Sequence, residues 1–145
     1  MDVVGIVIKQ KDSQFEENQK EILKKLGLLD PVPFELIEAK MTTPLNPPDW
    51  KPLTLATVSF GHSISVSLLH LARAYSILTN GGFDVKPTII KKSEDQNIRK
   101  RLFKRETSNK ILELLEAVVS DERGTGRSAN SSYYGIGGKT GTADK

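Results

Sequence analysis

Apolar side chains recur every three or four positions in several stretches of the chain, which is the spacing of an amphipathic helix. One such stretch covers residues 15–26, and Gly27 behind it is a natural helix stop. A second follows Ser67, whose hydroxyl is typical of an N-cap, and ends at the glycine pair of residues 81–82. These patterns predict two helices with defined ends.

A third helix is expected near the end of the chain, with Ile111, Leu114, Leu115 and Val118 on one face. Thr107 or Ser108 is its expected cap. The charged residues 91–106 before it indicate an exposed connection. The glycines within residues 121–130 indicate a loop after it.

The remaining segments lack helical periodicity. Residues 1–8 are rich in β-branched side chains and are typical of a strand. Residues 41–50 contain three prolines and predict an irregular loop. Residues 55–66 alternate small, polar and apolar types, which favours a loop or a short extended piece. Residues 83–90 predict a turn and a short strand.

Composition narrows the classes of protein that the chain can represent. Its 145 residues are about one domain, and 37% hydrophobic residues are enough for a core. A net charge of +3 is too small and too scattered for a nucleic-acid binder, so a mixed-charge surface is expected. The absence of cysteine excludes disulfides, thiolate catalysis and Cys-based zinc sites. No apolar run approaches a membrane span, and no export signal is expected in the chain.

The segment with most chemical content is residues 137–142, which read Gly-Gly-Lys-Thr-Gly-Thr. A phosphate-binding P-loop would also end in Gly-Lys-Thr, but it needs a glycine where the chain has Tyr133. The other interpretation is the K-T-G strand of serine acyl-transferases that react with β-lactams. By itself the triplet is weak, because a glycine-rich edge strand explains it equally well.

Further segments extend the match in a fixed order. Residues 56–66 read Ala-Thr-Val-Ser-Phe-Gly-His-Ser-Ile-Ser-Val and resemble the "A-T-x-S-x-G-x-x-I-S-V" segment of class B penicillin-binding proteins. Residues 71–75 and 80–82 resemble the "L-A-R-A-Y…N-G-G" helix and turn of that family. Residues 124–126, followed by residues 138–143, are similar to its "G-T-G…G-K-T-G-T-A" approach to the active site. The chain is identified as a member of this family of cell-wall transpeptidases.

The resemblance implies an α+β fold in which helices flank an antiparallel sheet. Residues 1–145 would be a partial transpeptidase domain, cut at both ends, that contributes several helices and the K-T-G strand. Carried over by position, Lys139 would supply positive charge in the site, Thr140 and Thr142 would bind a substrate carboxylate, and Gly141 would let the substrate backbone approach closely.

The implied reaction is acyl transfer in peptidoglycan cross-linking. A serine attacks the penultimate D-alanine carbonyl of a stem peptide, and an amine resolves the acyl-enzyme; β-lactams mimic the peptide and trap the serine. The resemblance implies no cofactor and no metal. It places the parent protein in the inner membrane with this domain in the periplasm, although the chain itself has no predicted anchor.

Two of the three catalytic motifs of the family are not found where the resemblance places them. No serine of the chain is followed by lysine three positions later, so the S-x-x-K nucleophile is absent. Residues 4–7 resemble the "V-G-x-V" helix start that follows S-x-N, but residues 1–3 are Met-Asp-Val. Family resemblance would also make residues 3–8 helical instead of extended. The isolated chain is therefore expected to be inactive.

Two other interpretations stay open. The chain could be a non-catalytic remnant or interaction module, which could associate with the missing part of the domain, or it could be a β-lactam sensor or β-lactamase.

The remaining polar candidates have ordinary explanations. His62 and His70 have no neighbouring ligand at a metal spacing. Residues 121–123 form a charge cluster that is expected to be a solvated turn, and Ser59 is expected to pack in a buried loop.

Overall fold

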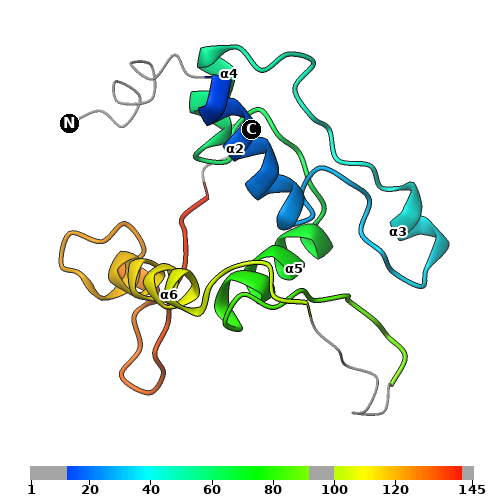
Figure 1. Cartoon of the computed structure of the whole chain (residues 1–145). Coiled ribbons are helices and arrows are strands. Elements are labelled where there is room, and N and C mark those ends of the chain that lie inside the picture. Colours follow the sequence, from blue (N-terminus) through cyan, green and yellow to red (C-terminus); the bar gives the residue numbers. More distant parts are fainter. Residues whose placement is uncertain (1–12, 92–99, 142–145) are drawn as a thin grey trace. The chain divides into compact units, whose positions relative to one another are not determined.

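The computed structural model describes residues 13–91 and 100–141, and within them helices dominate (Figure 1). Backbone pairing in the described residues is limited to two isolated antiparallel bridges, one between Leu45 and Ser65 and one between Phe83 and Arg101. The helices are α2 (Ser13–Lys25), α3 (Ile37–Met41), α4 (Pro52–Val58), α5 (Leu68–Thr79), α6 (Arg105–Ser120) and the short 3-10 helix η2 (Arg127–Ala129). The strand or helix expected at residues 1–8 lies outside the described residues.

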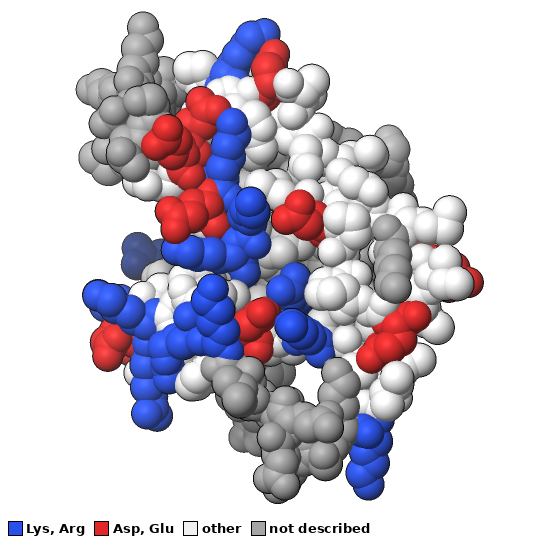
Figure 2. All heavy atoms as spheres, turned by 45° about the vertical axis from the view of Figure 1, so that its right-hand side comes forward, with Lys and Arg blue, Asp and Glu red and all other residues white. Residues whose placement is uncertain are grey.

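The chain divides into two compact units, which are described separately below. The first unit contains Met1–Tyr75 and Val85–Ile98, and the second contains Ser76–Asp84 and Arg99–Lys145. Helices α2, α3 and α4 belong to the first unit, α6 and η2 to the second, and α5 contributes residues to both. On the face shown in Figure 2, Lys and Arg side chains are intermixed with Asp and Glu, as expected for a mixed-charge surface, and a broad uncharged area lies beside them.

The predicted helix of residues 15–26 is confirmed as α2, which ends where Gly27 adopts a φ of +72°. The side chain of Gln19 ties α2 to α4, because its Nε2 donates to the Leu55 carbonyl at 3.1 Å and to Ser59 Oγ at 2.9 Å. Ser59 is exposed, so its expected burial is wrong. Its hydroxyl group donates to the Leu55 carbonyl at 2.9 Å and so contributes a hydrogen bond at the C-terminal end of α4.

Helix α4 corrects the expectation of a loop or extended piece for residues 55–58, whereas residues 59–66 form the expected loop, with Ser65 in a bridge. Pro52 stands at its first positions, where a missing N–H costs nothing and a fixed φ suits the helix. With seven residues, the helix makes about two turns, and its buried face consists of Leu55, Ala56 and Val58. Such a short stretch shows no clear helical period, and its β-branched residues do not favour a helix. The sequence pattern therefore did not indicate one.

The expected cap of α5 is confirmed, because the His70 backbone N–H approaches Ser67 Oγ at 3.4 Å. His70 is fully buried, and both ring nitrogens have partners. The Ser67 N–H donates to Nδ1 at 3.3 Å, which leaves Nε2 to carry the hydrogen and donate to the Asp30 carbonyl at 3.1 Å. The imidazole therefore joins the start of α5 to the segment after α2, a structural role and not a metal-binding one.

In the second unit, the predicted end of α5 is confirmed at Gly81 and Gly82, whose φ angles are +88° and +86°. Asn80 closes the turn, since its Oδ1 accepts from the Phe83 N–H at 2.8 Å and its Nδ2 donates to the Phe83 carbonyl at 3.0 Å. The Gly82 carbonyl then accepts from the Leu102 N–H at 2.7 Å. Of the strand expected in residues 83–90, only the Phe83 bridge is formed.

Helix α6 begins at Arg105, so Thr107 or Ser108 as its cap is wrong. Ser108 lies one turn into the helix with 1% of its surface exposed. Its hydroxyl donates to the Leu78 carbonyl and accepts from the Gly81 N–H at 3.1 Å. A residue type favoured at caps is used here for a buried contact between α6 and the end of α5.

The expected K-T-G strand forms no ladder among the described residues, since residues 135–141 carry no regular secondary structure. A strand is defined by pairing with a neighbour, and the described part of the chain supplies no strand beside it. The helices of the predicted α+β arrangement are present, while its sheet is represented only by the two bridges.

Candidate functional site

The segment that leads into the predicted site residues lies against α6. Just before these residues, the Gly138 N–H donates to the Leu115 carbonyl of α6 at 3.0 Å. The segment that leads into the site comes close to the helix, because a Cβ atom on Gly137 would lie 3.0 Å from the Glu116 nitrogen. Glycine at that position therefore allows the backbone to lie directly against α6.

The loop after α6 is tied to the same helix. The Gly126 N–H donates to the Val118 carbonyl at 2.9 Å, and Val118 is among the last residues of α6, whose carbonyls lack partners within the helix. A Cβ atom on Gly124 would lie 2.3 Å from the same oxygen. Both glycines of the G-T-G segment are thus explained by contact with the end of α6.

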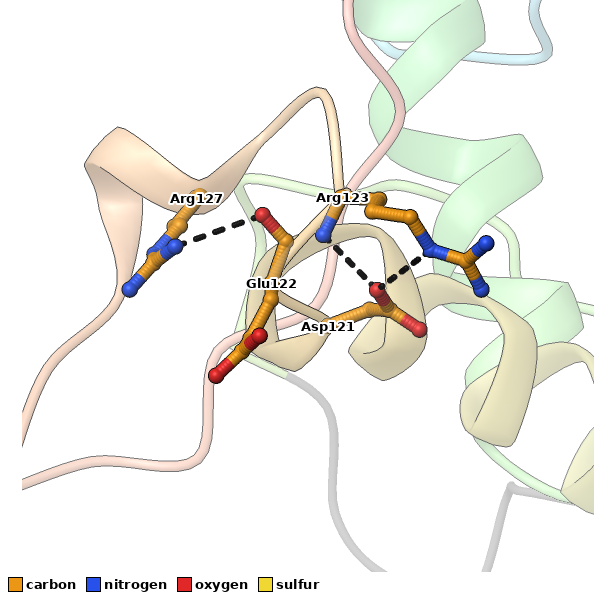
Figure 3. Close-up of polar contacts among 4 residues, drawn as sticks. All are labelled: Asp121, Glu122, Arg123 and Arg127. Atoms are coloured by element: carbon orange, nitrogen blue, oxygen red, sulfur yellow. Dashed lines mark hydrogen bonds and ion pairs between the residues drawn. The ribbon is translucent and has the colours of Figure 1, made fainter.

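Local polar contacts order this loop (Figure 3). Asp121 Oδ1 accepts from the Arg123 N–H at 2.8 Å, and the Asp121 carbonyl accepts from the Gly124 N–H at 2.9 Å. Arg127 Nη1 donates to the Glu122 carbonyl at 3.3 Å. The side chains of residues 121–123 are exposed, so the predicted solvated turn is confirmed. Thr125 follows in the same loop and is exposed.

The two motifs meet at their threonines. Thr125 Oγ1 and Thr140 Oγ1 are 3.4 Å apart, and both side chains are exposed. The exposed ammonium group of Lys139 donates to the Thr140 carbonyl at 2.7 Å. Gly141 has open space where a Cβ atom would lie, and Thr142 is outside the described residues. The residue pattern indicates both motifs, but it does not predict that their hydroxyl groups meet.

A cation and two hydroxyl groups on one exposed surface suit a carboxylate. An ionised carboxylate only accepts hydrogen bonds, and ammonium and hydroxyl groups can both donate them. Within the ranges that the structure describes, no cluster of three His, Cys, Asp or Glu side chains could hold a metal ion. Ammonium and hydroxyl groups of this kind are able to donate hydrogen bonds to an anion.

One motif match was overlooked in the sequence. Residues 128–130 read Ser-Ala-Asn and fit the letters of S-x-N. Ser128 lies in η2 and Asn130 follows it, and both are exposed. The Asn130 N–H donates to the Arg127 carbonyl at 3.0 Å, which closes the 3-10 turn. The triplet is therefore part of the loop that carries Thr125, downstream of the place where the family has its motif.

The first unit has a concavity of its own, of about 430 Å³, between the proline loop and the turn that follows α4. Leu45 and Ser65 in its wall exchange both backbone hydrogen bonds, at 2.9 and 3.0 Å. Its lining combines apolar side chains with Asn46, Asp49 and Thr54. The exposed carboxylate of Asp49 has its pKa held below the ordinary value by a hydrogen bond from Lys51. No residue predicted for the site lies here.

His62 and His70 do not form a site together. His62 is exposed, with its ring 6.5 Å from that of Phe60, while His70 is buried. The carboxylates of Glu113 and Glu116 are exposed on α6. None of the helices in the described ranges has the length and hydrophobicity needed to cross a membrane.

Comparison with known proteins gives a consistent result. The family model described as "Penicillin binding protein transpeptidase domain" matches residues 8–145. The chain is 39% identical over 124 residues to a probable peptidoglycan D,D-transpeptidase FtsI of Caulobacter vibrioides, covering 83% of this chain and 20% of that protein. It is 38% identical over 96 residues to a probable peptidoglycan D,D-transpeptidase PenA of Neisseria meningitidis, covering 66% of this chain and 16% of that protein.

Solved structures agree with this result. The transpeptidase domain of penicillin-binding protein 3 from Burkholderia pseudomallei matches with a TM-score of 0.81 and 32% identity, over 99% of this chain and 42% of that one. A peptidoglycan glycosyltransferase structure from Burkholderia ambifaria matches with a TM-score of 0.83 and 28% identity, over 99% and 44%. The helix-rich chain has part of the α+β fold of these domains, and it spans about a fifth or less of the length of the two curated relatives named above.

Proposed function

The chain belongs to the penicillin-binding protein transpeptidase domain family, and we propose that it supplies the carboxylate-binding wall of a peptidoglycan D,D-transpeptidase site. The observation that carries this proposal is the exposed group formed by Lys139, Thr140 and Thr125, which two tethers hold on α6. Such a group matches the terminal carboxylate of a D-Ala-D-Ala stem peptide, and also the carboxylate of a β-lactam.

Each residue of the segment has a proposed role. The ammonium group of Lys139 supplies positive charge beside the reacting centre, where it stabilises developing negative charge. Thr140 and Thr142 donate hydrogen bonds to the substrate carboxylate. Gly141, which has open space at its Cβ position, lets the substrate backbone lie against this segment.

The nucleophile of the proposed reaction comes from outside these 145 residues, because no serine here is followed by lysine at the third position. In the complete site that serine attacks the penultimate D-alanine carbonyl and D-alanine leaves; the amine of a neighbouring stem peptide then displaces the serine to form the cross-link. The isolated chain is proposed to hold no acyl group. The proposed location of the domain is the periplasm, where this substrate occurs.

The partner proposed for the chain is the remainder of a transpeptidase domain. Large apolar side chains are exposed in both units, for example Leu68 at 84% and Tyr133 at 88%. Leu71 and Tyr75 are exposed on the same face of α5 as Leu68, and contiguous exposed apolar surface commonly marks an interface. More than half of each solved neighbour lies outside the match, which is enough chain to cover these side chains.

A hybrid protein tests the proposal. Residues 8–145, which the family model matches, replace the corresponding part of the transpeptidase domain in the Caulobacter vibrioides relative, and the product is incubated with a fluorescent penicillin. We expect covalent labelling of the hybrid and none of the isolated chain. Lys139→Ala in the hybrid should lower the labelling rate by about 100-fold or more, while Lys110→Ala, on the exposed surface of α6, should leave it unchanged.

Two results would contradict the proposal. A folded hybrid that takes up no label, while the parent relative does, would mean that this segment cannot complete a transpeptidase site. A covalent adduct on the isolated chain would mean that a nucleophile is present in these residues after all. Circular dichroism of the hybrid separates loss of function from loss of fold.

A further inference from the structure

Thr125 belongs to the exposed group with Lys139 and Thr140, but it has been given no individual role so far. Its hydroxyl oxygen is 3.4 Å from that of Thr140, although the two residues are 15 positions apart. Both hydroxyl groups are exposed, so the contact is not a consequence of burial. The close approach of these two surface hydroxyl groups, one from each motif segment, therefore needs another physical explanation.

The fold brings the two threonines together through α6. The segment before Thr140 is bonded to the Leu115 carbonyl, and the residue after Thr125 is bonded to the Val118 carbonyl. Carbonyls three positions apart lie on neighbouring turns of one helix face. The two tethers therefore act on a single rigid element, and they bring the backbones of the two threonines close together, while the rotamer of each side chain is left to its own contacts.

A threonine hydroxyl donates one hydrogen bond and accepts through two lone pairs. If Thr140 donates its hydrogen to a substrate carboxylate, its lone pairs are available to the Thr125 hydroxyl. A chain of hydrogen bonds then runs from Thr125 through Thr140 to the carboxylate, and each bond in such a chain strengthens the next. The present 3.4 Å is longer than an ordinary hydroxyl contact, and such distances shorten when the anion is bound.

We propose that Thr125 is a positioning residue for the carboxylate-binding hydroxyl of Thr140, holding it in the rotamer that faces the substrate. The inference rests on the proposed function of the K-T-G segment, but its first step, the control of the Thr140 side chain by Thr125, is a property of the chain itself.

The first experiment measures that step in the isolated 145-residue chain. Three-bond NMR coupling constants report the χ1 rotamers of Thr140 in the parent chain, Thr125→Val, Thr125→Ser and Thr107→Val. Valine keeps the shape of threonine without the hydroxyl group, serine keeps the hydroxyl group, and Thr107 is an exposed threonine on α6. We expect a single rotamer in all but Thr125→Val, where Thr140 should average over two or more.

The second experiment uses the hybrid protein and two ligands, benzylpenicillin and its methyl ester, which lacks the carboxylate. Thr125→Val should lower the acylation rate by benzylpenicillin about fivefold, a loss typical of one hydrogen bond. It should leave the rate with the ester unchanged, and Thr125→Ser should restore the rate with the acid. A purely structural role would lower both rates together.

The outcomes are separable. Thr140 couplings that are the same in Thr125→Val and the parent chain would overturn the positioning role, and so would equal losses with the acid and the ester. Failure of the unsubstituted hybrid to react with penicillin would instead refute the proposed function, and the NMR comparison would still decide whether Thr125 controls Thr140.

Discussion

Replacing Ser108 with alanine removes the hydroxyl group that links α6 to the end of α5. In the structure this hydroxyl donates to the Leu78 carbonyl and accepts from the Gly81 N–H at 3.1 Å. The Leu78 carbonyl lies in the last turn of α5, where carbonyls have no intrahelical partner, and the Gly81 N–H lies in the turn just after the helix. Leaving buried groups unpaired costs about 1–3 kcal/mol. Since Leu78 and Gly81 are only half-buried, we expect a loss of about 2 kcal/mol.

Amide hydrogen exchange measures this loss where it occurs. A cost of about 2 kcal/mol corresponds to about a 30-fold faster exchange of the Gly81 amide in Ser108→Ala. The matched control is Ser120→Ala at the exposed end of α6, which should leave Gly81 protection unchanged. Equal protection of Gly81 in Ser108→Ala and the parent chain would refute the reasoning, because the buried hydroxyl would then contribute nothing to the joint.

Two glycine pairs give further predictions. Gly82→Ala should destabilise the second unit by more than about 2 kcal/mol, because the residue has positive φ and its Cβ would meet the Phe103 carbonyl oxygen at 2.2 Å. Gly61→Ala, with a similar φ but open space, should cost only about 1 kcal/mol, and thermal melts of the two variants would contradict this if their losses were equal. Gly137→Ala should displace the segment before the site from α6 and weaken the hydrogen bond from the Gly138 N–H to the Leu115 carbonyl, so that the Gly138 amide exchanges faster. Gly135→Ala, with nothing within 4 Å, should not, and matching exchange rates in both variants would argue against the close approach.

Local signals explain the successful predictions. The apolar period of residues 15–26 and the cap at Ser67 act over one or two turns, and α2 and α5 have the predicted limits to within two residues. The glycine stops at Gly27 and Gly82 are local as well, since they depend on a backbone angle that other residues rarely adopt.

The failures also have physical reasons. The helix from Pro52 to Val58 is too short to show a period, although the proline at its start was an available signal. Ser108 has the chemistry of a cap, but its partners lie about 30 positions earlier in the chain. No local rule distinguishes a serine that caps its own helix from one that bonds the end of another.

For the candidate site, the sequence by itself determined the identity of the family and the residues of the K-T-G segment, because these depend on residue types and their order. The contact between Thr125 and Thr140 was decided only by the tertiary structure. Two backbone hydrogen bonds to α6 place segments that are far apart in the chain on neighbouring helical turns, and only glycine leaves enough room for Gly124 and Gly137 to approach it. Such placement depends on packing between elements, which residue order alone does not specify.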